Sequence, residues 1–314
     1  GMIKVINPGS FSVKSNYFGE GELSAIALRV VCGGKFNQPT FMNNDLLNEI
    51  TKFVSLAPLH NPAVLQISER WTRSNPQIKQ IAVFDSEFFN YLPMTNKYYA
   101  LPIEFQNKYG IRRMGFHGLS HESALIQTAE KLSKPVNECN LITIHLGQGS
   151  SIAAIYNGNP IDTSMGFTPM EGLVMGTRSG DVDPGILLYL LQLGKMPAEI
   201  NSLLNDQSGW YGLCGEKDFH NVIEKSSSDP RAKLALDMVI YRIQKYIGAY
   251  WFALKGKVDA IVFTGKIGTD SEMVRDLVIK DIPELKDVKI LHVESKENEL
   301  IYQKAKKVLG EINS

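Results

Sequence analysis

The sequence predicts an α/β protein built from two domains. Two units of the form strand, glycine turn, strand occur, one near residue 9 and one near residue 148, and segments with helical periodicity follow each of them. A chain of 314 residues is long enough for two domains and a large core. We therefore expect each half of the chain to open with strands and to continue with helices.

The first half opens with a predicted β-hairpin. Residues 2–7 and 11–18 are extended runs, the second with alternating apolar and polar residues, and Pro8-Gly9-Ser10 between them is a tight turn. Further along, the pattern predicts a strand at 24–31, helices at 44–56 and 62–74, and a short buried strand at 81–84.

The second half repeats this arrangement. Residues 141–147 and 150–158 read as strands around a glycine turn, and residues 231–254 have the period of a long amphipathic helix. The apolar run at 258–265 predicts a buried strand that leads directly into another helix.

Residues 162–184 have neither a helical nor a strand period and are predicted to form a site loop. The stretch holds four glycines, two prolines, three aspartates and one arginine, Arg178. A guanidinium binds carboxylate or phosphate with paired hydrogen bonds, and glycines let an anion approach the backbone closely. By itself such a stretch is more often an ordinary surface loop with a salt-bridged arginine, so the assignment needs other segments.

Composition excludes several classes of partner and site. Basic and acidic residues number 33 each, so no net charge attracts nucleic acid or an anionic membrane. The three cysteines are widely spaced without a CxxC pair, which argues against a disulfide framework or structural zinc and fits a reducing cytoplasm. No secretory signal and no uncharged apolar run long enough for a membrane span is visible.

Five segments, in order, resemble the acetate kinase family. They are residues 5–14, 112–121, 142–151, 162–184 and 261–275. Such an ordered set is far more specific than any one glycine motif. The resemblance implies a two-domain fold of the actin, sugar kinase and heat-shock chaperone type (ribonuclease H-like), with a nucleotide cleft between the domains. It implies a reduced N-terminal domain at 1–86, on which a C-terminal helix at 301–314 packs back, and a second domain at 87–300 with the nucleotide-binding segments.

The resemblance also implies a catalytic set. Its members are Asn7, Arg29, Asp85, His117 and Arg178. A carboxylate that attacks a terminal phosphate needs its negative charges neutralised and aligned, a task suited to two arginines, a histidine donor and Mg²⁺ or Mn²⁺. Asn7, Asp85 and Glu299 are the implied metal ligands. Without the motifs, Asp85 would be taken as a helix cap and His117 as a core histidine.

Substrate and nucleotide contacts follow from the same resemblance. A small apolar pocket for the methyl group of acetate is implied at Val31, Leu59, Phe116 and Pro169, although isolated apolar residues are usually plain core. The implied ATP contacts are Ser10, Ser12, Lys14, His145, Gly147, Gln148, Gly149, Gly265, Lys266, Ile267 and Gly268. Backbone N–H groups of glycine turns can bind phosphate oxygens, but hairpins also need glycine for their backbone angles.

The larger departures from the family pattern occur at three places. Only residues 15–28 separate the first motif from Arg29, where family members carry a considerably longer insertion. In the adenosine segment, Gly265-Lys266 replaces a glycine pair, and Thr269-Asp270 replaces Glu-Asn. Near the C-terminus, either Glu297 or Glu299 can stand for the metal-linked glutamate of the family.

The predicted function is a cytoplasmic acetate kinase-like phosphotransferase. It would transfer phosphate reversibly between ATP and acetate or propionate, giving ADP and an acyl phosphate, with the family's homodimer as its assembly. No nucleic acid or membrane partner is expected. Two alternatives stay open: an acyl kinase that uses pyrophosphate or another inorganic donor, suggested by Lys266, and a degenerate family member that binds without turnover.

Overall fold

The computed structural model describes residues 1–9, 13–54 and 60–310, and the chain divides into two compact units. Unit 1 comprises Gly1–Asn90, Phe116–Ser123 and Lys296–Ser314, and unit 2 comprises Tyr91–Gly115 and Ala124–Ser295. The sequence-based division placed all of 87–300 in the second domain. In the structure, residues 87–90, 116–123 and 296–300 belong to unit 1, because the chain passes between the units four times, whereas the predicted division has two crossings.

Unit 1 contains a five-stranded sheet in the order β2-β1-β3-β5-β4. The strands are β1 (Met2–Pro8), β2 (Val13–Phe18), β3 (Leu23–Val30), β4 (Thr40–Phe41) and β5 (Lys79–Phe84). Strands β1, β3 and β5 are parallel, whereas β2 pairs antiparallel with β1 and β4 pairs antiparallel with β5. The predicted antiparallel pairing of β1 and β2 is therefore confirmed, with Pro8 inside β1, whereas Ser10 of the predicted turn lies outside the described residues.

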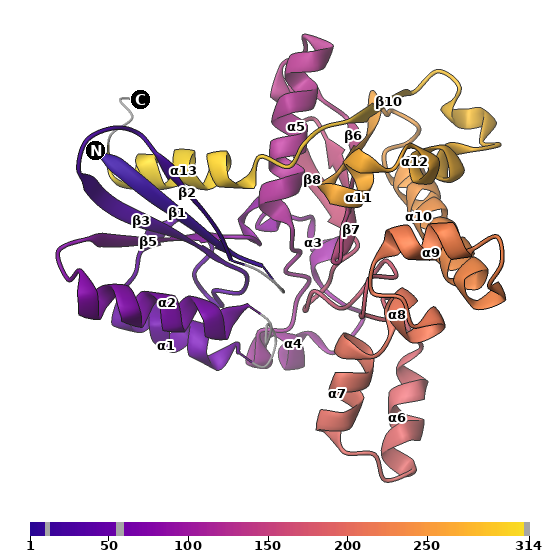
Figure 1. Ribbon diagram of the computed structural model, residues 1–314, viewed down its shortest axis with the longest axis horizontal. Coiled ribbons are helices and arrows are strands. Elements are labelled where there is room, and N and C mark those ends of the chain that lie inside the picture. Colours follow the sequence, from indigo (N-terminus) through magenta and orange to yellow (C-terminus); the bar gives the residue numbers. More distant parts are fainter. Residues whose placement is uncertain (10–12, 55–59, 311–314) are drawn as a thin grey trace. The chain divides into compact units, whose positions relative to one another are not determined.

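Helices cover both faces of this sheet (Figure 1). On one face, Ile3, Val5 and Ala25 pack with Ile301 and Ala305 of α13 (Glu297–Val308). On the other face, alternate residues of the same strands pack against α1 (Asn44–Lys52) and α2 (Asn61–Ser74). Side chains of a strand point alternately to opposite faces, so the apolar runs of β3 and β5 serve both layers.

Unit 2 contains a second five-stranded sheet, in the order β10-β9-β6-β7-β8. Its strands are β6 (Leu141–Leu146), β7 (Ser150–Tyr156), β8 (Asn159–Thr163), β9 (Ala260–Thr264) and β10 (Lys289–His292). As in unit 1, an antiparallel hairpin, β6 and β7, lies beside a strand that runs parallel to its first member. The repeated strand, turn, strand pattern in the sequence thus reflects two related sheets.

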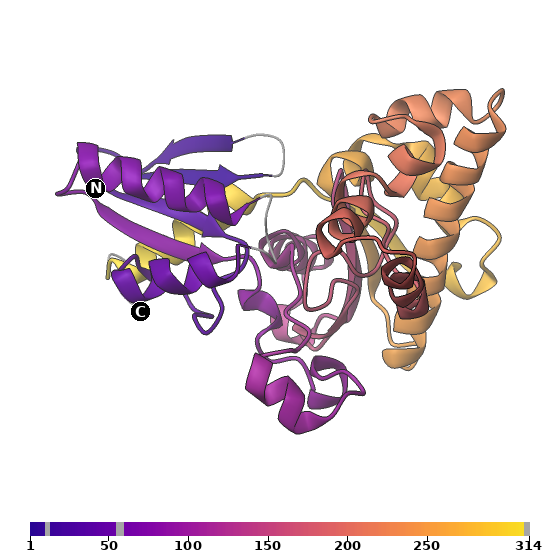
Figure 2. The same cartoon turned by 90° about the horizontal axis from the view of Figure 1, so that it is seen from below.

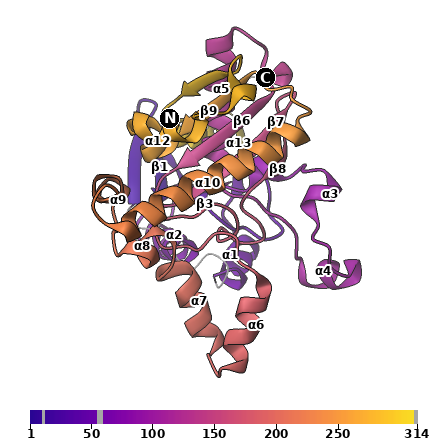
Figure 3. The same ribbon diagram turned by 90° about the vertical axis from the view of Figure 1, so that its right-hand side faces the viewer.

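The helix α10 (Pro230–Ala253) covers one face of the unit 2 sheet, and the part of α5 (Gly118–Leu132) from Ala124 lies over the other (Figure 2). The helices α6 (Pro184–Gln192) and α7 (Pro197–Asp206) lie side by side and project away from this sheet (Figure 3). No helix among the described residues is long and apolar enough to cross a membrane.

The remaining helices are short and connect these layers. They are α3 (Met94–Lys97), α4 (Ile103–Tyr109), α8 (Gly209–Cys214), α9 (Phe219–Lys225), α11 (Gly265–Asp270) and α12 (Glu272–Ile279), with 3₁₀ turns at Glu87–Phe89 (η1), Val136–Glu138 and Pro283–Leu285.

Candidate functional site

Three predicted catalytic residues lie at one edge of the unit 1 sheet. Asn7 is near the end of β1, Arg29 is near the end of β3, and Asp85 directly follows β5. Strands β1, β3 and β5 are parallel, so their carboxyl ends meet at the same edge, where open α/β sheets bind ligands. The sheet therefore brings together residues that are far apart in the sequence.

Arg29 and Asp85 form a buried ion pair at this edge. Nη2 of Arg29 lies 2.9 Å from Oδ2 of Asp85, and the two side chains are 9% and 1% exposed. Nη1 of Arg29 donates to Oδ1 of Asn7 at 3.1 Å. Burial alone would lower the pKa of the Arg29 guanidinium, but the charges of Asp85 and Glu297 and the hydrogen bond to Asp85 outweigh burial and raise it. Arg29 is therefore held charged and fixed in orientation.

The segment that begins α5 is fastened to Asp85 through the backbone. The N–H of His117 donates to Oδ2 of Asp85 at 2.8 Å, and the N–H of Gly118 donates to the Asp85 carbonyl at 2.9 Å. A Cβ at Gly118 would lie 2.3 Å from that carbonyl oxygen, so glycine is required for the approach. His117 has φ 56°, a left-handed conformation uncommon outside glycine. His117 has this conformation at the position where its backbone N–H donates to the Asp85 carboxylate.

The start of α13 completes the cluster with Glu297 and Asn298. Nδ2 of Asn7 donates to Oε2 of Glu297 at 3.0 Å and to Oδ1 of Asn298 at 2.9 Å. Glu299, the residue predicted as a metal ligand, is exposed and is not brought to this cluster. Two positions along a helix correspond to a turn of about 200°, so Glu297 and Glu299 point in opposite directions. Of the two glutamates that the sequence left open, Glu297 is therefore the one that contacts Asn7.

Asn7, Asp85 and Glu297 fit a site for Mg²⁺. Oδ1 of Asp85 is buried and has no hydrogen-bond partner among the described residues, and a buried carboxylate oxygen calls for a cation or a donor. Within the described chain, no three His, Cys, Asp or Glu side chains gather as a metal-binding group. Mg²⁺ is usually held by one or two carboxylates with water and substrate phosphate as further ligands, so two carboxylates and one amide suffice.

In unit 2, two glycine turns meet at the carboxyl ends of β6 and β9. The turn at Gly147–Gly149 follows β6, and Gly265 follows β9, which runs parallel to β6 with His145 opposite Thr264. Gly265 has φ +74°, and a Cβ there would lie 2.6 Å from the Leu146 carbonyl oxygen. The two turns predicted to hold phosphate and adenosine are therefore adjacent.

We expect Gly265→Ala to destabilise unit 2 more than Gly194→Ala does. Both glycines have positive φ, at +74° and +85°, but a Cβ at Gly194 would meet nothing within 4 Å. The backbone strain of roughly 1 to 2 kcal/mol is common to both variants, whereas only Gly265→Ala adds the collision with Leu146. Thermal unfolding measures the difference, and equal melting temperatures would contradict the close approach.

Arg178 is a buried cation that has no ionic partner in the part of the chain that the structure describes. Its side chain is on the site loop, the residue is 5% exposed, and Nη1 donates to the Pro169 carbonyl at 2.8 Å. No carboxylate among the described residues lies within ion-pair distance of it, and burial lowers the pKa of its guanidinium to about 10. An uncompensated buried charge is costly. Arg178 is thus prepared to bind an anion, with Pro169, a predicted acyl-pocket residue, beside it.

Hydrogen bonds hold the site loop in place near Arg178 and at Asp181. Near Arg178, the N–H of Gly176 donates to the Gln148 carbonyl at 3.0 Å, which joins the loop to the β6–β7 turn. Oδ1 of Asp181 accepts from the Gly172 N–H at 2.9 Å, and its Oδ2 accepts from the Tyr246 hydroxyl of α10 at 2.8 Å. The loop has no regular secondary structure between 164 and 183 but has a defined shape.

A second anchor holds the beginning of the loop, and sequence reasoning missed it. Nη2 of Arg113 lies 2.9 Å from Oε1 of Glu171, whose Oε2 accepts from the Tyr99 hydroxyl at 2.6 Å. Nη1 of Arg113 also donates to the Thr163 and Met165 carbonyls. Arg113 is in one of the motif segments, which was the available signal, but its partner Glu171 is far along the chain.

The other predicted residues are distributed over both units. Val31 and Phe116 are buried in unit 1, and Lys14 is exposed on β2 opposite Asn7. In unit 2, Nε2 of His145 lies beside Gly147, and Ile267 and Gly268 belong to α11 with Lys266, which is exposed. Ser10, Ser12 and Leu59 lie outside the described residues.

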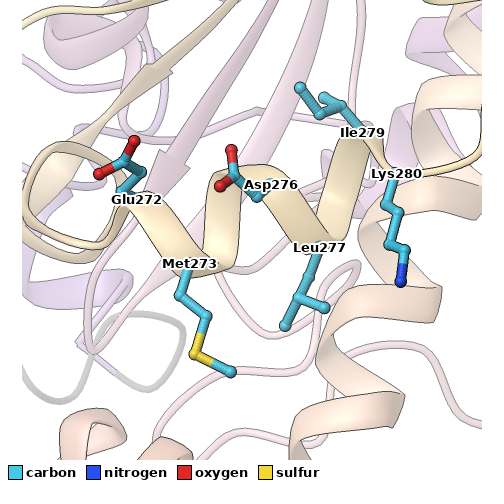
Figure 4. A pocket seen from close by; sticks show the side chains of 6 residues that line it. All are labelled: Glu272, Met273, Asp276, Leu277, Ile279 and Lys280. Carbon is cyan, nitrogen blue, oxygen red and sulfur yellow. The ribbon is translucent and has the colours of Figure 1, made fainter.

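A surface hollow lies apart from these residues, along α12 (Figure 4). It has a volume of about 480 Å³ and is lined by Glu272, Met273, Asp276, Leu277, Ile279 and Lys280. All six belong to one short segment, and none is a predicted site residue.

Comparison with known proteins gives a family match and relatives that agree with one another. The model of the acetokinase family matches residues 3–308. An acetate kinase of Sulfurovum sp. (strain NBC37-1) is 46% identical over 260 residues, which are 82% of this chain and 65% of that protein. The chain thus spans slightly less than two thirds of the length of that curated relative.

Two solved structures have the same fold. The structure of Porphyromonas gingivalis acetate kinase has a TM-score of 0.87 and 31% identity, covering 98% of this chain and 99% of that one. The structure of a propionate kinase from Francisella tularensis subsp. tularensis SCHU S4 has a TM-score of 0.89 and 32% identity, covering 98% of this chain and 99% of that one. The predicted fold class is confirmed by these likenesses.

Proposed function

This chain belongs to the acetokinase family, and we propose that it is a short-chain carboxylate kinase that transfers a phosphoryl group reversibly between ATP and acetate or propionate. The observation that carries the proposal is Arg178, a buried guanidinium without an ionic partner among the described residues. A buried planar guanidinium whose charge is not neutralised by the described residues is well suited to bind a carboxylate or a phosphate. The acetate and propionate kinases similar to this chain support the acyl substrates.

The reaction we propose is a direct transfer. A carboxylate oxygen of the acid forms a bond to the terminal phosphorus of ATP while the bond from that phosphorus to the ADP oxygen breaks, so no proton has to move. Arg178 would neutralise the negative oxygens that approach one another. The His117 imidazole would donate a hydrogen bond to the transferring group, and its backbone is fixed by Asp85. Positioning and charge neutralisation supply nearly all of the catalysis in such transfers.

Mg²⁺ would be held in unit 1 by Asp85 and Glu297, with Asn7 as a third ligand. When bound, the ion would neutralise phosphate oxygens of the nucleotide. Arg29 donates to Asn7 and to Asp85 and thereby orients two of these ligands. Partners of this kind hold metal ligands in the geometry that binding requires.

The nucleotide would be held in unit 2. The turn at Gly147–Gly149 would bind phosphate and the start of α11 at Gly265 would lie against the adenosine, and the exposed Lys266 adds a positive charge beside them. ATP is the donor in our proposal because the family match covers these segments. The pyrophosphate donor and the degenerate binding protein receive no support from the relatives reported above.

The test is acyl phosphate formation by the purified chain with acetate and Mg²⁺, comparing ATP with pyrophosphate. We expect turnover with ATP and with both acetate and propionate, because one extra methylene changes discrimination by only about 1 to 3 kcal/mol. Turnover with pyrophosphate alone would overturn the donor assignment. No turnover with either donor would leave only a binding role.

We further propose that the protein is a homodimer that pairs through α6. This helix has no buried residue, although most of its side chains are apolar and five large ones are exposed on or directly after it: Ile186, Leu188, Tyr189, Leu191 and Leu193. A helix that is apolar all round is normally covered.

The three free, buried cysteines fit the reducing compartment that we propose for the enzyme, the cytoplasm.

Leu188→Glu is expected to convert the dimer to a monomer. A carboxylate in the centre of an apolar interface would lose its hydration without gaining a partner. Light scattering coupled to gel filtration measures the mass. Met273→Glu, on the exposed side of α12, is the matched control and should leave the mass unchanged. A wild-type monomer at micromolar concentration would contradict the proposal.

A further inference from the structure

Unit 1 contains a second, largely buried charge cluster beside its candidate catalytic residues. We call Lys304, Glu87 and Glu122 the Lys304 cluster. Nζ of Lys304 lies 3.2 Å from Oε2 of Glu87 and 2.9 Å from Oε2 of Glu122, and it donates a hydrogen bond to Oε1 of Glu122 at 3.2 Å. The side chains of Lys304, Glu87 and Glu122 are 13%, 21% and 24% exposed. One cation therefore meets two carboxylates away from most of the solvent.

Each member of the Lys304 cluster follows a candidate catalytic residue on the same segment. Glu87 begins η1 directly after Asp85 and Ser86, and Glu122 is in the first turns of α5, which starts beside His117. Lys304 is on α13, seven residues after Glu297. Seven residues are nearly two turns of a helix, so Lys304 and Glu297 share one face of α13. The cluster thus touches all three segments that carry Asp85, His117 and Glu297.

Backbone hydrogen bonds already join two of these segments. The N–H groups of His117 and Gly118 donate to Asp85. The third segment, α13, is joined near its start by the Lys296 N–H, which donates to Oγ of Ser123 at 3.2 Å. Lys304 provides an ionic link from α13 to η1 and α5 at once. Its removal would therefore loosen α13 against both partners.

The charges of this cluster favour a charged Lys304 and make the loss of its ammonium costly. Burial lowers the pKa of the Lys304 ammonium, but Glu122 and Glu87 outweigh burial and raise it, so Lys304 stays charged. Without the ammonium, two carboxylates would face one another in a region of low polarity. Breaking a buried ionic group by removing one partner is strongly destabilising for this reason.

We propose that Lys304 is a positioning residue for the catalytic cluster of unit 1, holding the segments that bear Asp85, His117 and Glu297 in their mutual arrangement. This inference rests on the proposed function for its catalytic consequence, but the arrangement itself can be measured without turnover. Lys304 does not touch the candidate metal ligands. It acts through the segments on which they are carried.

The test compares three variants of the full chain. Lys304→Met keeps the length of the side chain and removes its charge, and Lys304→Arg keeps the charge. Lys306→Met removes a charge from the same helix at a position beside the Tyr302 ring. Amide hydrogen exchange of peptides covering residues 85–92 and 112–121 reports whether the segments separate. Peptides from α2 serve as an internal reference for global unfolding. Initial rates of acyl phosphate formation give kcat and the KM for acetate.

We expect Lys304→Met to exchange at least about tenfold faster in both peptides, with α2 unchanged, and kcat to fall about tenfold or more with a smaller change in KM. Lys304→Arg and Lys306→Met should behave like the wild type. Wild-type exchange in Lys304→Met overturns the inference, and so does wild-type kcat in an active enzyme. If the wild type forms no acyl phosphate, the proposed function fails, and the exchange comparison alone decides the inference.

Discussion

Arg178→Ala is expected to reduce kcat/KM for acyl phosphate formation by about 10³-fold, which is about 4 kcal/mol of transition-state stabilisation. The guanidinium is buried, charged and without an ionic partner among the described residues, so its charge is available to the reacting anions. Truncation to alanine leaves those anions without a neutralising group. The measurement is the initial rate over a range of acetate concentrations.

The stability of the same variant separates a catalytic role from a structural one. Among the described residues, the Arg178 side chain makes one hydrogen bond, to the Pro169 carbonyl, and its removal also relieves the cost of burying an unpaired charge. We therefore expect the free energy of unfolding to change by no more than about 1 kcal/mol. Arg73→Ala, on the exposed surface of α2, is the control for both measurements. A variant with wild-type kcat/KM would exclude Arg178 from the reaction.

Arg178→Lys refines this result. Lysine keeps the positive charge but presents a single ammonium in place of the planar fork of donors. If Arg178 grips an anion through paired hydrogen bonds, lysine should recover only part of the lost rate. Full recovery would show that charge without geometry is enough.

Asp85→Asn is expected to abolish turnover and to reduce the stability of unit 1 by about 3 kcal/mol or more. The asparagine side chain has nearly the same size, so the change removes the charge and little else. Arg29 would then remain buried at 9% exposure without the carboxylate that lies 2.9 Å from it. The loss of the Asp85 charge would also remove one of the two carboxylates proposed to hold Mg²⁺.

Urea unfolding of unit 1 can be followed through Trp71, which is on α2, in a background where Trp210 and Trp251 are replaced by phenylalanine. Asp45→Asn is the matched control, because Asp45 pairs with Lys35 at the surface, where the two side chains are 65% and 58% exposed. An exposed pair of this kind contributes less than about 1 kcal/mol. Equal losses for Asp85→Asn and Asp45→Asn would contradict the importance of the buried pair.

Much of the fold could be predicted from local patterns. The alternating residues of β1 and β2, the apolar runs of β3, β5, β6 and β9, and the long period of α10 lie where the sequence placed them. These features depend on side chains a few positions apart, which a sequence displays directly. The short helices α3, α4 and α6 to α9 were not predicted, because short segments and exposed apolar residues give no clear period.

The sequence by itself determined the chemistry available at the site. It supplied an asparagine, an arginine and an aspartate at the ends of predicted strands or close to them, and an arginine among glycines in a loop without regular structure. Parallel strands end at one edge, so the first three residues were bound to meet once the sheet formed. The five ordered segments then indicated the family.

The tertiary structure alone decided which groups complete the site. Glu297 and not Glu299 reaches Asn7, because the phase of α13 against the sheet selects one side of the helix. Arg29 is neutralised by Asp85, whereas Arg178 meets no carboxylate among the described residues. The Lys304 cluster joins residues 87, 122 and 304. Partners so distant in sequence leave no local pattern, since their meeting depends on how helices and strands pack.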